Sequence, residues 1–159
     1  MNTDQSLREH LLDLLRGGGA HIDFETLVAD FPGSIINQKA EGVPYTPWQL
    51  LEHMRIAQWD IVRFSVEPNH VSPDFPAGYW PASDALGSHD LWQATVSAFR
   101  GDLKEMENLV ADPATDLCQP LPHGSGQTVL REALLLADHN SYHLGALVLL
   151  KRVLNQDRQ

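Results

Sequence analysis

The segment TVLREALLLADHNSYHLGALVLLKRVL, residues 128–154, is the longest stretch of helical pattern in the chain. At about 100° per residue, His139 and His143 lie about 40° apart on one face. Asp138, Lys151 and Arg152 fall toward the opposite side. The apolar members of the histidine face, which we expect to point into a core, are Leu135, Leu136, Ala146, Leu147, Leu150 and Val153. A helix of this length with a broad apolar stripe needs other helices to cover it.

Three further long helices and one short one are predicted upstream. Gly17-Gly18-Gly19 ends the first, and Thr46-Pro47 supplies a cap and a first-turn proline for another. The triple glycine lacks the Lys-Ser/Thr ending of a phosphate-binding loop, so it is interpreted as a helix breaker. The expected helices span residues 4–16, 23–30, 47–66 and 90–110. With no strand pattern, the sequence predicts an all-α, antiparallel-type four-helix bundle forming a single domain, residues 1–159.

One connection is unusually long. Residues 67–88 contain four prolines, two glycines and the aromatic pair Tyr79-Trp80. This composition predicts an irregular segment that runs over the surface, and connections of such length are often functional.

Composition excludes several classes of function. The chain has 159 residues, is 43% hydrophobic and carries a formal net charge of -10, which disfavours binding to nucleic acid or to anionic membranes. It has no apolar run of about 20 residues that could span a membrane. The single cysteine, Cys118, cannot form an internal disulfide, and the start MNTDQSLREHLLDLL does not resemble a secretory signal. We therefore expect a cytoplasmic protein.

The histidines give the clearest chemical signal. His139 and His143 are one helical turn apart, so their side chains can converge on one ion. His53 lies on the apolar stripe of the helix over 47–66 and also faces the core. Because burying three unpaired imidazoles is costly, a divalent cation held by all three is the favoured interpretation. Three nitrogen ligands leave room for water, as in catalytic metal sites.

Two other interpretations stay open: a metal-free core in which each histidine is hydrogen-bonded separately, and a purely structural metal. A zinc protease is rejected because Asn140 occupies the position of its glutamate base. Four side chains are candidates for a supporting role: Glu132, Asp60, Tyr142 and His123. For Glu132 a macrodipole role is equally plausible, and for His123 an exposed loop position is favoured. The remaining histidines, expected in solvent, are His10, His21, His70 and His89.

Three segments carry a resemblance to a known family. They are LLDLLRGGGAHIDFETLVADFP (11–32), PWQLLEHMRIAQWDI (47–61) and HGSGQTVLREALLLADHNSYHLGALVLLKRVL (123–154). In this order they resemble the DinB-like superfamily of metalloenzymes. The resemblance implies a four-helix bundle with a divalent metal, zinc or nickel, held by His53, His139 and His143.

The resemblance also implies a kind of chemistry. Some DinB-like proteins are metal-dependent transferases that use a low-molecular-weight thiol such as bacillithiol or mycothiol, others are classed as hydrolases, and many are dimeric. We therefore expect a homodimer acting on a small-molecule electrophile, with a non-catalytic metal-binding or stress-related bundle as the alternative. No segment here matches a thiol-binding pocket.

Overall fold

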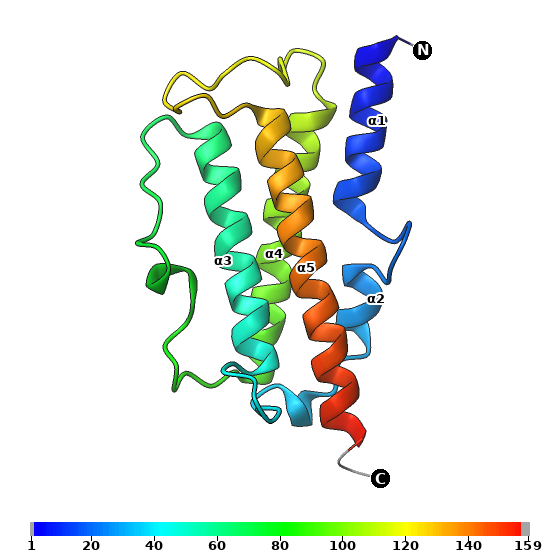
Figure 1. The fold of residues 1–159 in the computed structure, drawn as a ribbon, viewed down its shortest axis with the longest axis vertical. Helices are drawn as coiled ribbons and strands as arrows, with labels where there is room; N and C mark the ends of the chain where they lie inside the picture. The colour runs from blue at the N-terminus through cyan, green and yellow to red at the C-terminus, as the bar shows by residue number, and fades with distance from the viewer. Residues whose placement is uncertain (1, 157–159) are drawn as a thin grey trace.

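The computed structural model describes residues 2–156, and every extended element of secondary structure in that range is a helix (Figure 1). Within this range the only β-type pairing is an isolated bridge between Pro120 and Thr128. The all-α prediction is confirmed. In chain order the elements are α1 (Thr3–Arg16), α2 (Phe24–Ala29), η1 (Gly33–Ile35), α3 (Pro47–Val66), η2 (Ala77–Tyr79), α4 (His89–Ala111) and α5 (Val129–Gln156).

The helix ends follow from local chemistry. Thr46 and Gln49 form a reciprocal capping box, in which each side chain bonds the backbone N–H of the other, and Pro47 occupies the first turn of α3. The Thr128 hydroxyl accepts a hydrogen bond from the Arg131 N–H at 3.1 Å and caps α5. Gly17 ends α1 with a φ of 71°, a conformation that favours glycine. The predicted helices therefore begin and end within two residues of the observed ones.

The expectation of an antiparallel bundle is wrong for α3 and α4. Thr95 on α4 donates to the Glu52 carboxylate on α3 at 2.8 Å, and ten residues further along α4 Glu105 pairs with Arg63. Residue numbers thus rise together along the two helices, which makes them parallel. The chain must therefore return from the end of α3 to the start of α4. Residues 67–88 make this crossover along the outside of α3 (Figure 1).

The other two long helices run in the opposite direction. Asn140 on α5 donates to Gln58 on α3 at 2.8 Å, and three residues later His143 lies beside His53, earlier in α3. Because residue numbers fall along α3 as they rise along α5, these two helices are antiparallel. In the same way, α1 runs antiparallel to the α4 helix that it contacts.

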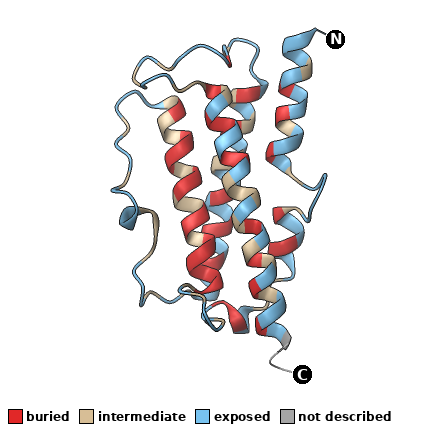
Figure 2. Ribbon diagram, viewed as in Figure 1, coloured by how far each residue is buried: buried red, intermediate tan, exposed pale blue. Residues whose placement is uncertain are grey.

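The buried interior, red in Figure 2, contains two apolar clusters. One lies around the first half of α3 and the second half of α5, and includes Leu50, Leu51, Met54, Leu144, Leu147 and Leu150. The other lies around the opposite halves, and includes Ile61, Val62, Ala133, Leu136 and Ala137. Between them α3 and α5 face each other with amide and imidazole side chains.

The predicted core stripe of α5 is too wide. Leu135 is 37% exposed and Val153 is 39% exposed, so both lie on the solvent edge of the helix. Leu136, Leu147 and Leu150 are buried as predicted. In the described range, no helix has the length and apolar character needed to cross a bilayer.

Candidate metal centre

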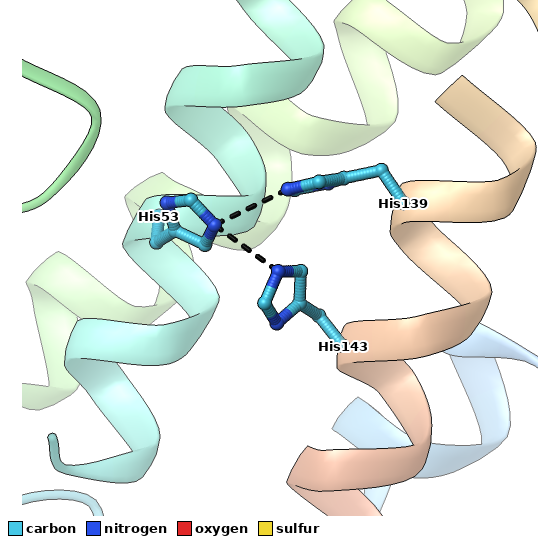
Figure 3. Close-up of side chains that lie close together, drawn as sticks. All are labelled: His53, His139 and His143. Atoms are coloured by element: carbon cyan, nitrogen blue, oxygen red, sulfur yellow. Dashed lines mark hydrogen bonds between the residues drawn. The ribbon is translucent and has the colours of Figure 1, made fainter. Parts of the chain in front are cut away.

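Helices α3 and α5 bring His53, His139 and His143 together, as the sequence predicted (Figure 3). The Nε2 atom of His53 lies 3.2 Å from Nε2 of His139 and 3.2 Å from Nε2 of His143. One ring nitrogen from each of the three residues lies within 4.8 Å of the other two. His53 is buried at 8% exposure, and the two α5 histidines are half-buried. The cluster therefore sits inside the bundle with one side toward solvent.

The spacing of these nitrogens suits a metal ion. Two ligand nitrogens on a tetrahedral zinc ion lie about 3.3 Å apart when the Zn–N bonds are about 2.0–2.1 Å long. If both 3.2 Å contacts were hydrogen bonds, His139 and His143 would each have to direct an Nε2–H at the one lone pair of His53 Nε2. A cation among the three rings removes that conflict because each lone pair then has a partner.

The orientation of His53 is set by the crossover. Its Nδ1 lies 2.8 Å from the backbone carbonyl oxygen of Tyr79, to which it can only donate. The proton of the neutral His53 ring therefore resides on Nδ1, and the Nε2 lone pair is free. This is the tautomer that can bind a metal ion through Nε2. The indole of Trp80 stacks on the same imidazole, with centroids 3.9 Å apart and planes 2° from parallel. His53 is thus held by a hydrogen bond and by a stacked ring.

The two α5 histidines are held less firmly. Nδ1 of His139 and Nδ1 of His143 are buried and have no hydrogen-bond partner among the residues that the structure describes. The ring centroids of His139 and His143 lie 4.5 Å apart, and the centroid of the Tyr142 ring lies 4.9 Å from that of His143. Of the three histidines, His53 is therefore the one that the protein orients most completely.

Burial keeps the three rings uncharged at neutral pH. Desolvation lowers the pKa of His53 below its ordinary value of 6.5, although the Tyr79 carbonyl acts in the opposite direction. Desolvation, together with the neighbouring imidazoles, lowers the pKa of His139 and of His143 to about 4. Neutral imidazole is the form that binds a metal.

Among the supporting candidates, Asp60 and Tyr142 lie near the centre. Asp60 is 8% exposed and accepts hydrogen bonds from the Tyr79 phenol at 2.6 Å and from His70 Nε2 at 2.7 Å. Tyr142 is 74% exposed beside His143. Asp60 is thus linked to His53 through Tyr79, whereas Tyr142 borders the open side.

Glu132 and His123 lie elsewhere. Glu132 is buried at 2% exposure and pairs with Arg131 at 2.6 Å, in the first turn of α5. His123 was expected in solvent, and that prediction is wrong. Its Nε2 donates to the Phe64 carbonyl at 2.7 Å, which attaches the loop before α5 to the end of α3. Carbonyls in the last turn of a helix lack helical partners, which explains this contact.

His70 is also a correction. It was predicted to be solvated, yet its side chain is only 6% exposed because it bonds Asp60 and packs edge-on against Trp59. His10, His21 and His89 are exposed, as predicted. The roles of Tyr79, Trp80 and His70 were missed, although the aromatic pair in an otherwise irregular connection was a visible signal.

Comparisons with known proteins leave the family open. No protein-family model matches the chain, and searches of curated proteins and of solved structures found no match either. The case for a site therefore rests on the geometry of the three histidines.

Proposed function

We propose that the protein binds one divalent metal ion, zinc or nickel, through Nε2 of His53, His139 and His143. The observation that carries this proposal is the convergence of three neutral imidazoles around a His53 whose tautomer is fixed by the Tyr79 carbonyl. A carbonyl that takes the second ring proton of a ligating histidine is a common feature of metal sites. Imidazole ligands suit zinc, nickel, copper and iron, and the DinB-like resemblance favours the first two.

We further propose that the protein is a DinB-like four-helix bundle and a metal-dependent enzyme acting on a small electrophile. Three protein ligands leave at least one position for water or substrate, which distinguishes catalytic from closed structural zinc sites. When bound, such an ion supplies Lewis acidity that makes water or a thiol reactive near neutral pH. Thiol transfer and hydrolysis are therefore the two reaction types to test.

The surroundings of the site determine how a substrate would reach it. Trp80 and the crossover cover His53, whereas His139 and His143 are only half-buried. A small molecule arriving from solvent therefore meets the exposed ring of Tyr142 beside His143. Asn140 and the fully buried Gln58 continue the polar layer between α3 and α5 into the bundle next to His139, and the half-buried rings of His139 and His143 leave the open side toward solvent.

A non-catalytic role is the second candidate, and one observation favours it. The three ligands join α3 to α5 across the middle of the bundle, so a bound ion would also cross-link two long helices. If the ion serves only this purpose, removing it should lower the melting temperature, and small ligands such as azide should leave the spectrum of a cobalt-substituted protein unchanged. Spectral change on adding such ligands supports the open site.

Metal content provides the first test. Protein purified without a histidine tag should contain about one ion per chain by elemental analysis. The His53→Ala/His139→Ala double variant should contain almost none, and a matched His10→Ala/His89→Ala variant, which alters two exposed histidines, should keep the wild-type content. Equal metal content in all three proteins would refute the site.

Reaction type can then be separated with the metal-loaded protein. A thiol transferase should accelerate consumption of a low-molecular-weight thiol by monochlorobimane, and the metal-site double variant should not. Cleavage of esters or amides that proceeds without any thiol, and that no thiol accelerates, would exclude transfer and favour hydrolysis.

A further inference from the structure

The crossover is attached to α3 beside the metal centre by a buried carboxylate. Asp60 lies two turns after His53, about 10 Å further along α3. Its Oδ2 accepts a hydrogen bond from the Tyr79 phenol at 2.6 Å, and its Oδ1 accepts one from His70 Nε2 at 2.7 Å. Both donors belong to the crossover. The Asp60 carboxylate therefore bonds the first part of the crossover, at His70, and its middle, at Tyr79, to α3.

Tyr79 contacts α3 at two points. Its phenol reaches Asp60, and its backbone carbonyl accepts the Nδ1–H of His53 at 2.8 Å. Burial, together with Asp60, raises the pKa of the phenol to about 12, so Tyr79 remains a proton donor at neutral pH. The side chain of Tyr79 therefore fixes the position of the carbonyl that orients His53.

The neighbours of Tyr79 strengthen this arrangement. Trp80 stacks on the His53 ring, and Tyr45 stacks on Trp80 with centroids 5.2 Å apart. On the other side, a Cβ on Gly78 would come within 2.8 Å of Pro73 Cβ, so the backbone packs here as only glycine permits. The crossover thus presents a closely packed surface to His53.

We propose that Asp60 is a positioning residue of the metal centre, acting through the Tyr79 phenol to hold the Tyr79 carbonyl against His53 Nδ1. The proposal rests on the metal site described above and assigns to Asp60 no contact with metal or substrate. It explains why a carboxylate is buried at this level of α3: two donors from the crossover converge on it, one at each oxygen.

Zinc affinity of four variants, measured by competition with a chromophoric chelator at neutral pH, tests the proposal. Asp60→Ala should weaken binding about 10- to 100-fold, as is usual when a partner behind a metal ligand is lost. Tyr79→Phe should weaken it by about 10-fold, because the phenol no longer anchors the carbonyl. Asp60→Asn keeps an oxygen for the phenol and should stay within about threefold of wild type.

The control is Thr95→Ala, which removes a partly buried hydrogen bond from α4 to Glu52 on α3, away from the crossover. It should destabilise the fold without changing zinc affinity. If Asp60→Ala and Tyr79→Phe bind zinc as tightly as Thr95→Ala does, the positioning role is wrong, even though the metal site stands.

A metal-free readout separates the two proposals. Long-range nitrogen–proton NMR spectra of the imidazoles should show His53 protonated at Nδ1 in the wild type and in Asp60→Asn. In Asp60→Ala and Tyr79→Phe they should show a mixture of tautomers. If the wild type binds no zinc, the metal proposal fails while these spectra still decide the role of Asp60. If His53 keeps its Nδ1 proton in both Asp60→Ala and Tyr79→Phe, the positioning role of Asp60 is overturned.

Discussion

Two polar contacts join α3 to α5 in the layer between the apolar clusters. They differ in whether each hydrogen-bond donor faces an acceptor. In one, Asn140 Nδ2 donates to Gln58 Oε1 at 2.8 Å, and Gln58 Nε2 donates to the Phe99 carbonyl on α4 at 2.6 Å. In the other, three imidazole nitrogens face one another. Both hydrogen bonds of the amide contact pair a donor with an acceptor, and Asn140 Oδ1 is left without a partner among the described residues. The imidazole contact instead brings three ring nitrogens together, where a cation could bind.

This difference separates stability from function within a single layer. Buried hydrogen bonds with matched donors and acceptors specify how helices pack, and losing one partner leaves the other unsatisfied. Three uncharged bases directed at one point contribute little to packing but form a binding site. Substitutions in the two contacts should therefore have opposite consequences for stability and for metal affinity.

The largest expected effect is the loss of metal binding in His139→Leu. Removing one of three ligands should weaken zinc binding by about a thousandfold or more, equivalent to about 4 kcal/mol. The metal-free variant should be at least as stable as the wild type, because an apolar side chain replaces a buried imidazole. Chelator competition measures the zinc affinity, and urea unfolding measures the free energy of unfolding. If His139→Leu keeps its zinc affinity but loses stability, the imidazole contact serves packing and not metal binding.

Gln58→Leu should show the opposite behaviour. It leaves Asn140 Nδ2 and the Phe99 carbonyl without their partner, so the free energy of unfolding of the metal-free protein should fall by about 2–4 kcal/mol. Zinc affinity should stay within about threefold of wild type, since no ligand and no part of the crossover is touched. A large loss of zinc affinity in this variant would show that the two contacts are not independent.

Adding the metal should stabilise the wild type by an intermediate amount. Free zinc at about 100 times its Kd should raise the free energy of unfolding by about 2.7 kcal/mol. The same rise is expected in Gln58→Leu, and none in His53→Ala/His139→Ala. Thermal melts with zinc and with a chelator measure the shift, and a shift that persists in the double variant would locate the binding elsewhere.

The pH dependence of the metal-free protein should give the smallest effect. Folding lowers the pKa of His139 and of His143 from 6.5 to about 4, so the unfolded chain binds more protons in that interval. Their contribution to stability is therefore complete above pH 6.5 and is lost as the pH falls to about 4. His139→Leu/His143→Leu should lack this part of the decline in melting temperature, and identical pH profiles would contradict the low pKa values.

Much of the helical framework could be predicted from sequence because its signals are local. The cap at Thr46-Pro47 and the breaker at Gly17 act within one turn, and the start of α3 and the end of α1 follow from them. The three histidines were found in the same way, since helical periodicity places each of them on an apolar face. Local periodicity therefore predicted the three histidines that the structure brings together.

The direction of α4 and the support of His53 could not be predicted in this way. Both depend on the crossover, whose 67–88 sequence has no periodicity to show which end of α3 it returns to. Tyr79 meets His53 across 26 residues and Asp60 across 19, contacts that arise only once the crossover is folded. His70 was misassigned for the same reason, because a loop histidine is buried here by a distant carboxylate.

The most direct test of the metal centre is a crystal of the zinc-loaded protein, with diffraction data collected on both sides of the zinc absorption edge. We expect one anomalous peak among the three imidazoles, about 2.0–2.1 Å from Nε2 of His53, His139 and His143, with at least one further position open to solvent. A peak that lies elsewhere, or rings that remain in place with no peak among them, would contradict the central claim.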